Sequence, residues 1–384
     1  MRQTRRVSKM KLGVAEKIMW PAFLIGVLAI FLSVPTVYGQ GGVKEMPPPP
    51  PVWRAKPTPT PKPEPEVLDV IKTTSNLVMV PVSVTDQTGN AVQGLKVPDF
   101  RLLEEGKEQE ISGIGDPEQV PLAIAVLFDI SSSVGGQGFF TSQQNAAATF
   151  LRLVMKPVDR AAIFSIGKEP IVLQPLSSAE ASTVKIMAIP PPVNNVPTAF
   201  YDTVAAAAKY LRENAPSNYR RVIVVLSDGD DNFSEQIRDI SIAEARATMS
   251  RQEVNAAIQA ASQRSHQRAI AETQKLVQQA DVIFYSVNPG GPSIKLNVTA
   301  MRAERGMEAI AEATGGSAFV PDSDLDLEKV FRRVAAELRG QYLLQYYGDS
   351  TAPAGQFRRI TVAVPARNDV RVRARQGYYP KKQN

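Results

Sequence analysis

The sequence of 384 residues contains no cysteine and only one histidine, His266. The absence of cysteine excludes disulfide bonds, thiolate metal sites, thiol catalysis and attachment to a membrane through a lipidated cysteine. A single histidine excludes a zinc site that is built from several histidines. The apolar content of 43% is ordinary for a globular protein, and the length allows one large domain or two smaller ones besides tails.

Basic charge is concentrated at the N-terminus. The formal net charge is +6, and residues 1–39 contain six basic side chains and one acidic side chain, a local charge of +5. The remaining residues therefore sum to about +1. Because the basic charge belongs to this leader, the composition does not support binding to nucleic acid.

Residues 1–39 have the form of a signal peptide or a membrane anchor. A basic segment is followed by the apolar run Ala22–Val34 and by small residues near Gly39. The run is shorter than the roughly 20 residues of a spanning helix, which favours a signal peptide over an uncleaved anchor. In either case we expect a secreted, periplasmic or envelope-associated protein that contacts the membrane only through this segment.

Two β segments are expected on either side of a central domain. Residues 40–66 are a proline-rich linker, with the dense prolines in Met46–Glu66. Residues 67–118 are predicted to form an N-terminal β unit, because valines alternate with other residues from position 78 to position 84. Pro81 in this strand predicts an edge strand or a bulge. Residues 340–380 form a C-terminal β segment with the same alternation, so the two flanks are expected to build one sandwich-like unit.

Residues 119–339 are predicted to form an α/β domain with a doubly wound, mostly parallel sheet. The apolar runs Ala123–Phe128, Val222–Leu226 and Val282–Val287 have no polar alternation, which indicates strands buried on both faces. Helical periodicity separates them. Residues 234–280 are rich in Gln, Ala and Arg, and they are predicted as a helical insertion of two or more helices that partly projects from the domain.

A carboxylate and hydroxyls follow the first apolar run. Asp129, Ser131 and Ser133 occupy alternate positions, and side chains two apart in an extended segment project to the same side. A second acid, Asp228, follows another of the apolar runs. In open α/β sheets, ligands bind beyond the carboxyl ends of the strands. These oxygen donors suit Mg²⁺, or alternatively Mn²⁺ or Ca²⁺, better than softer metals.

Three motifs occur in an order that resembles a von Willebrand factor A domain. They are the DxSxS sequence at 129–133, a threonine before a helix at Thr198, and LSDGDDN at 226–232. The flanks are similar to those of acidobacterial von Willebrand factor A-related proteins, in a DFRLLEEGK-like stretch (Asp99–Lys107) and an RARQGYY-like end (Arg373–Tyr379). The resemblance implies a metal-ion-dependent adhesion site.

The resemblance also implies the role of each ligand. Ser131, Ser133 and Thr198 would hold the ion through hydroxyls, and Asp129 and Asp228 would act partly through bound water. Many family members have Gly-Gly before the threonine, where this chain has Val196-Pro197, and a helix N-cap is an alternative role for Thr198. Asp228 has an alternative role in the turn, and the neighbouring acids at 230 and 231 are expected to be exposed turn residues.

Two carboxylates and three neutral hydroxyls leave a divalent ion able to exchange a water for an outside ligand. The expected function is metal-dependent adhesion, in which a protein partner supplies an Asp or Glu carboxylate. One alternative is a structural interaction module with a vestigial metal site. Another is a phosphatase or hydrolase that uses Asp129, but Ser131 stands where a phosphatase would need a second acid. His266 is expected to be a solvated side chain, so we expect no enzyme activity.

Overall fold

The computed structural model describes residues 77–131, 137–191, 196–238, 250–291, 298–323, 326–349 and 353–380. The predicted leader, the proline-rich linker and Ser133 lie outside these residues. Within the described ranges, no helix is both long enough and apolar enough to cross a membrane.

The central sheet has six strands in the order β10-β9-β8-β5-β6-β7. The strands are β5 (Leu122–Asp129), β6 (Arg160–Ile166), β7 (Ile171–Ser177), β8 (Arg220–Leu226), β9 (Val282–Val287) and β10 (Ala318–Phe319). Only β7, at one edge, runs antiparallel to its neighbour. The predicted doubly wound, mostly parallel α/β fold is therefore confirmed.

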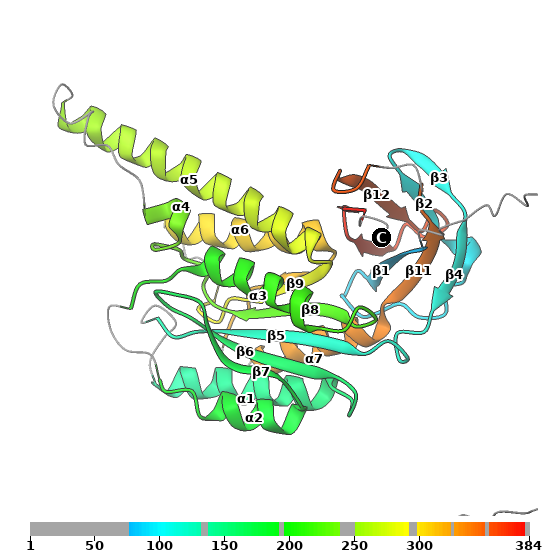
Figure 1. Ribbon diagram of the computed structural model, residues 1–384, viewed down its shortest axis with the longest axis horizontal. Helices are drawn as coiled ribbons and strands as arrows, with labels where there is room; N and C mark the ends of the chain where they lie inside the picture. The colour runs from blue at the N-terminus through cyan, green and yellow to red at the C-terminus, as the bar shows by residue number, and fades with distance from the viewer. Residues whose placement is uncertain are drawn as a thin grey trace, which may run out of the picture. The chain divides into compact units, whose positions relative to one another are not determined.

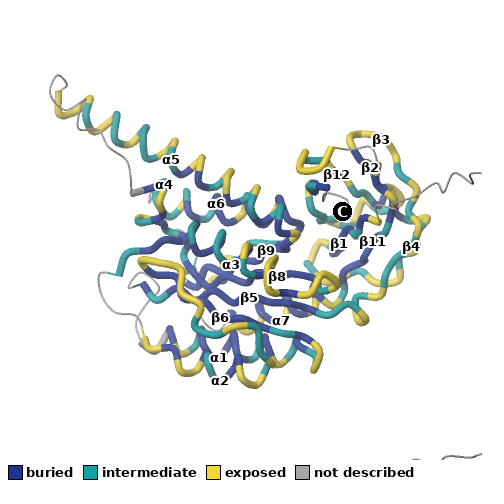
Figure 2. The backbone as a smooth tube through the Cα atoms, viewed as in Figure 1, coloured by how far each residue is buried: buried dark blue, intermediate teal, exposed yellow. Residues whose placement is uncertain are grey.

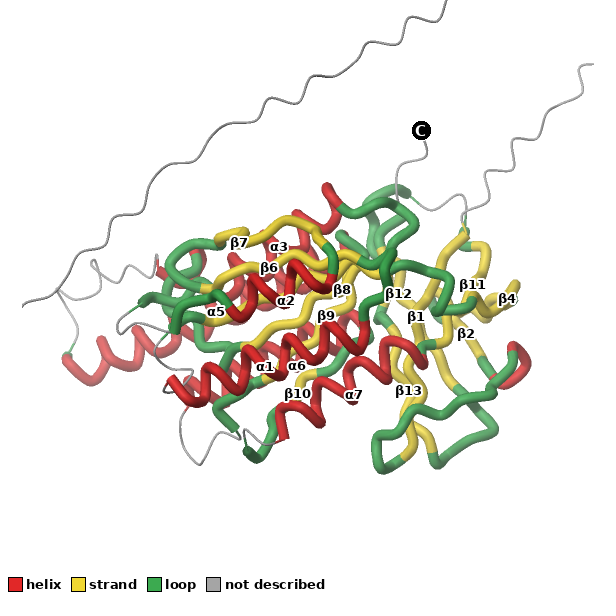
Figure 3. The backbone as a smooth tube through the Cα atoms, turned by 90° about the horizontal axis from the view of Figure 1, so that it is seen from below, coloured by secondary structure: helices red, strands yellow, loops and turns green. Residues whose placement is uncertain are grey.

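Helices cover both faces of this sheet (Figure 1). One face carries α1 (Gln137–Val154), α2 (Ala179–Met187) and α7 (Leu327–Gly340), and Figure 3 is seen from that side. The other face carries α3 (Phe200–Asn214), α5 (Arg251–Gln279) and α6 (Val298–Thr314), with the single turn α4 (Glu235–Arg238) beside α5.

The central strand β5 explains why its sequence has no polar alternation. Its side chains alternate between the two faces, so Ile124, Val126 and Phe128 pack with α1 and α7, while Ala123 and Leu127 pack with α3. Every residue of β5 is buried, as the dark tube in Figure 2 shows. A strand with two covered faces has to be apolar throughout.

Helix α5 is longer than the part of it that packs against the domain. It has 29 residues and begins with a capping box formed by Ser250 and Glu253. All of its buried residues lie between His266 and Val277, in the C-terminal half. The N-terminal half extends beyond α6 (Figure 1).

The flanking segments form two four-stranded sheets. The first has the order β13-β1-β11-β4, and the second β14-β12-β2-β3. Their bounds are β1 (Leu77–Asp86), β2 (Arg101–Glu104), β3 (Lys107–Gln109), β4 (Ile111–Gly115), β11 (Tyr342–Tyr347), β12 (Arg358–Ala363), β13 (Val370–Ala374) and β14 (Gly377–Tyr378), with a 3₁₀ turn η1 (Val97–Asp99) before β2. The prediction of one sandwich-like unit from both flanks is confirmed, and its core contains Val80, Leu102 and Leu344.

The prediction of an edge strand or a bulge from Pro81 was wrong, since the register of β1 with β11 is regular at Pro81. Strand β1 lies inside its sheet, between β13 and β11. However, β13 pairs with β1 only from Val82 onward, so Pro81 has a strand neighbour on the β11 side alone. A missing N–H is tolerated where one side of the strand is unpaired.

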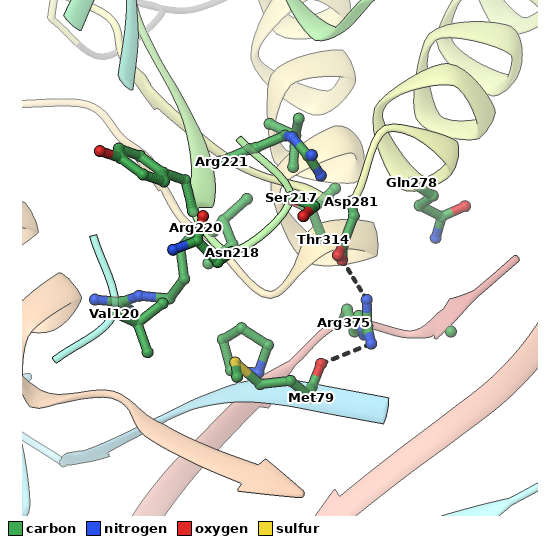
Figure 4. A pocket seen from close by; sticks show the side chains of 15 residues that line it. Met79, Val120, Ser217, Asn218, Arg220, Arg221, Gln278, Asp281, Thr314 and Arg375 are labelled. Atoms are coloured by element: carbon green, nitrogen blue, oxygen red, sulfur yellow. Dashed lines mark hydrogen bonds and ion pairs between the residues drawn. The ribbon is translucent and has the colours of Figure 1, made fainter. Parts of the chain in front are cut away.

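Buried polar contacts join the β unit to the α/β domain. Glu337 on α7 forms an ion pair of 2.6 Å with Arg373 on β13. A cavity of about 150 Å³ lies nearby, where Arg375 pairs with Asp281 and donates to the Met79 carbonyl at 2.7 Å (Figure 4). Arg220, which begins β8, also lines this cavity. Because β5 and β8 are parallel, the cavity lies at the opposite edge of the sheet from Asp129.

Candidate metal centre

The carboxyl ends of β5 and β8 lie side by side. Their register pairs Phe128 with Leu226, so Asp129 and Ser227 follow at neighbouring positions. Asp129 is fully buried. One carboxylate oxygen accepts a hydrogen bond from the Ser227 hydroxyl at 2.6 Å, and the other accepts one from the Ser131 backbone N–H at 2.8 Å.

The charge of Asp129 has no compensating cation in the described part of the chain. Burial raises the pKa of Asp129 to about 6, the hydrogen bonds from Ser131 and Ser227 act against this shift, and the nearby charge of Asp228 adds to it. A buried carboxylate without a basic partner is unfavourable as an anion. A bound cation would remove this penalty.

Two more of the predicted ligands lie beside Asp129. The side chain of Ser131 is buried and interacts with the Asp129 carboxylate. Asp228 is half-buried, and one of its carboxylate oxygens accepts a hydrogen bond from the Asp230 N–H at 3.1 Å. The structure therefore brings Asp129, Ser131 and Asp228 together.

The segment that contains Thr198 is hydrogen-bonded to the loop after β8. The Thr198 N–H donates to the Asn232 side-chain oxygen at 2.9 Å, and the Thr198 carbonyl accepts from the N–H groups of Asn232 and Phe233, each at 3.1 Å. Thr198 is buried. The N-cap residue of α3 is Ala199, so Thr198 does not have the alternative role of helix N-cap.

The prediction that Asp231 is an exposed turn acid was wrong. Its side chain is buried, and its carboxylate accepts hydrogen bonds from the N–H of Tyr201 at 2.8 Å and from the hydroxyl of Ser234 at 2.5 Å. The other oxygen accepts from the N–H groups of Phe233 and Ser234. Tyr201 lies in the first turn of α3, where N–H groups have no partner within the helix. Asp231 therefore caps α3 from another segment of the chain.

Asp230, the other acid predicted to be exposed, is half-buried. Burial raises the pKa of Asp230, Asp228 raises it further, and Arg302 on α6 opposes the shift. The loop after β8 is thus an acidic loop, in which Asp231 has a structural role and Asp228 lies near enough to Asp129 to raise its pKa.

Replacing Asp231 by alanine is expected to destabilise the protein by about 3 kcal/mol, because four donors to a buried carboxylate lose their acceptor. Urea unfolding followed by circular dichroism measures the change. The control is Asp322→Ala, which removes an exposed acid and is expected to shift stability by less than about 0.5 kcal/mol. Equal effects of the two substitutions would contradict the capping role.

His266 was predicted to be solvated, and it is buried instead. Its Nδ1 lies 2.8 Å from the Ser262 carbonyl, and its Nε2 lies 3.2 Å from the Asp231 carbonyl. Its ring also packs edge-on to Tyr201. Because the C-terminal half of α5 packs against α3, the histidine is buried and contacts the backbone of the acidic loop at Asp231.

Ser227 is a site residue that the sequence reasoning missed. Its hydroxyl donates to Asp129 and accepts from the Gly229 N–H at 2.9 Å. The signal was present, since Ser227 follows the apolar run Val222–Leu226 just as Asp129 follows Ala123–Phe128. Gly229 has a φ of +74°, and a Cβ there would lie 2.8 Å from the Met307 sulfur, so the loop needs glycine at this position.

The donor set fits a hard divalent cation. It consists of carboxylates and hydroxyls, with no sulfur ligand and no imidazole. No group of three or more His, Cys, Asp or Glu side chains that could hold a metal occurs among the described residues. The candidate site has only two acids, Asp129 and Asp228, and its other predicted donors are hydroxyls.

The sheet topology places the sequence motifs at one edge of the sheet. The sheet has a central β5, with β8 and β9 on one side and the antiparallel edge strand β7 on the other. The two acidic motifs lie at the carboxyl ends of β5 and β8, and the threonine segment is bound to the second of them. Residues 122–340 therefore have the doubly wound α/β fold that the resemblance to von Willebrand factor A domains implies.

No model of a protein family matches the sequence, and no curated protein matches it. Among solved structures, the chain is similar to the vWF domain of the type V pili tip protein Mfa5 from Porphyromonas gingivalis. The two are 14% identical over 56% of this chain and 94% of that chain, with a TM-score of 0.42.

The chain is also similar to BatB from Bacteroides thetaiotaomicron, with 14% identity, coverage of 56% of this chain and 97% of that chain, and a TM-score of 0.38. A third similar structure is proximal thread matrix protein 1 from the mussel byssus with a zinc-occupied MIDAS motif. It is 14% identical over 60% of this chain and 49% of that chain, with a TM-score of 0.40. The chain thus spans about half the length of the mussel protein.

Proposed function

We propose that this protein is an exported adhesion module that binds a divalent cation at the carboxyl ends of β5 and β8. Mg²⁺ is the preferred ion in this proposal. The ligands would be Asp129, Ser131, Ser133, Thr198 and Asp228. The observation that carries the proposal is the fully buried Asp129 carboxylate, which among the described residues receives only hydroxyl and amide donors and lies near a second acid.

A protein partner with an Asp or Glu carboxylate is the proposed ligand of the cation. When bound, the ion supplies a positive centre whose remaining positions exchange water for an anionic oxygen. The residues of this chain position that centre. Ser227 holds one oxygen of Asp129, and the hydrogen bonds between Thr198 and Asn232 hold the threonine segment against the acidic loop.

A binding function is favoured over catalysis by the surroundings of the possible catalytic groups. Ser131, not an acid, stands two positions after Asp129, where a phosphatase would have its proton donor. Both ring nitrogens of His266 lie against backbone carbonyls, and its imidazole therefore has no serine hydroxyl to activate. Export is proposed from the leader, which gives the module a place in the cell envelope or outside it.

Metal binding is tested by isothermal titration of Mg²⁺, Mn²⁺, Ca²⁺ and Zn²⁺ into the full chain. We expect a dissociation constant for Mg²⁺ on the order of 0.1–1 mM, as for sites with few charged ligands. Ser131→Ala is expected to weaken binding by about tenfold, because it removes one hydroxyl ligand. Ser217→Ala is the matched control, since Ser217 is exposed and lies at the opposite edge of the sheet. A site with no heat of binding for any of these ions would overturn the proposal.

The partner is tested separately by capture from the envelope fraction of the producing cell. Capture is expected in Mg²⁺, with loss in EDTA and loss with the Ser131→Ala bait. Capture that is equal in Mg²⁺ and EDTA would instead support a structural interaction module with a vestigial metal site.

A further inference from the structure

A groove of about 660 Å³ runs between α5 and α6. Apolar side chains from both helices line it, and two of them are accessible, Val298 at 70% exposure and Met301 at 36%. The lining also contains Arg302 and Arg305, and none of the described lining residues is acidic. The groove therefore combines apolar side chains with uncharged polar ones, mainly glutamines, and with positive charge.

The groove adjoins the loop of the candidate metal centre. His266 lines the groove, and its Nε2 contacts the carbonyl of Asp231. Arg302 donates to the Ser262 hydroxyl at 3.2 Å and acts electrostatically on Asp230. One wall of the groove is thus connected through single contacts to the acidic loop that carries Asp228.

Arg305 provides the groove with a positive charge that has no ion-pair partner among the described residues. It is exposed, and within the described ranges it forms no ion pair. Exposed apolar side chains beside such a cation suit a segment that combines apolar and acidic side chains. Apolar contacts would provide the affinity, and the charge would select the orientation and exclude basic segments.

We propose that the groove between α5 and α6 binds an acidic segment with apolar side chains, which belongs to the same protein partner whose carboxylate the metal centre takes. This inference rests on the proposed function for the identity of the partner, but the groove and the metal centre are chemically independent. A partner that occupies both is held at two points, which raises its affinity without a stronger metal site.

The experiment uses the full chain and three fluorescein-labelled peptides of about twelve residues, which is the length of about three helical turns. The first combines Leu with Glu, the second has Lys in place of Glu, and the third has Ser in place of Leu. Fluorescence anisotropy in EDTA measures groove binding alone. We expect the Leu–Glu peptide to bind at least about tenfold more tightly than either of the others, and its affinity to fall with salt.

Two surface substitutions locate the peptide. Arg305→Glu reverses the unpaired charge, and Val298→Asp places an acid on the exposed apolar rim, so each is expected to weaken binding by about tenfold. Arg264→Glu is the matched control, since Arg264 is exposed on α5 and does not line the groove. It is expected to leave the affinity unchanged.

The outcomes separate the groove from the metal centre. Unchanged peptide binding by Ser131→Ala in EDTA is expected, even if the metal titration has failed. Equal affinity for the Leu–Glu and Leu–Lys peptides would overturn the proposal, as would equal effects of Arg305→Glu and Arg264→Glu. Sedimentation that shows a dimer dissociated by Val298→Asp would also overturn it, because the occupant would then be a second copy of this chain.

Discussion

Replacing Asp129 by asparagine is expected to abolish the binding of divalent cations and, at the same time, to stabilise the metal-free protein. The first effect follows from the loss of the buried negative charge that would attract the ion, and it is expected to weaken the affinity by at least about 100-fold. The second effect follows from burial. The raised pKa of Asp129 means that its carboxylate anion is less stable in the folded protein than in water.

The size of the stabilisation can be estimated from the pKa. A rise from 3.8 to about 6 corresponds to about 3 kcal/mol at neutral pH, which is an upper limit for the gain in Asp129→Asn. The folded metal-free protein binds this proton more tightly than the unfolded chain does. In EDTA, the stability of the wild type should therefore rise as the pH falls through about 6 toward 4, and the asparagine variant should lack this contribution.

Thermal unfolding in EDTA and in Mg²⁺ measures both effects. The wild type is expected to gain stability in Mg²⁺ by binding linkage, whereas Asp129→Asn unfolds at the same temperature in both buffers. Asp322→Asn, an exposed acid, is the control and should behave as the wild type. A variant that is less stable than the wild type in EDTA would contradict the view that the buried charge is unfavourable.

The part of the candidate site that lies directly at strand ends could be predicted from the sequence. Asp129 and Asp228 follow buried apolar runs, and parallel strands bring their ends to one edge of a sheet. The roles of the acidic residues within the loop after β8 could not be predicted from the sequence pattern. Asp230 and Asp231 are adjacent acids, and only the approach of α3 decides that Asp231 caps a helix while Asp230 does not.

The same reasoning applies to His266. A glutamine-rich helix with few large apolar residues predicts solvent exposure, and the N-terminal half of α5 has it. The burial of His266 depends on α3 and α6 packing against the other half of α5, which local sequence does not encode. Tertiary contacts between distant segments therefore determine what the histidine touches.

The elements of the fold that were missed have weak local signals. Strand β7 is an antiparallel edge strand with exposed and half-buried side chains, so it lacks the apolar run of the central strands. Strand β6 contains a shorter apolar run, and α2 has only nine residues. The buried central strands and the long amphipathic helices were predictable because two-sided burial and a 3.6-residue period leave strong patterns.

Replacing Glu337 by alanine is expected to lower the stability of the whole chain by about 3–5 kcal/mol. Glu337 is buried on α7, where one carboxylate oxygen pairs with Arg373 and the other accepts a hydrogen bond from the Tyr285 hydroxyl at 3.1 Å. Its removal leaves the half-buried charge of Arg373 without its ion-pair partner. The pair spans the α/β domain and the β unit, so the loss weakens the junction between them.

An exposed glutamate on α6 provides a matched control. Glu308 lies in the interior of that helix, and Glu308→Ala makes the same change in helix propensity and net charge while the junction pair stays intact. It is expected to change the free energy of unfolding in urea by less than about 0.5 kcal/mol. Similar effects at the two positions would mean that the buried pair does not stabilise the junction.

A double-mutant cycle with Arg373→Ala separates the pair from the surrounding packing. If the unpaired charge is the main penalty, the double variant Glu337→Ala/Arg373→Ala will be destabilised by less than the sum of the single variants. Additive effects would instead assign the loss to the contacts of each side chain. A large coupling energy would mean that the two flanks of the chain, which fold into one β unit, are joined to the domain between them by a pair of opposite charges rather than by apolar packing alone.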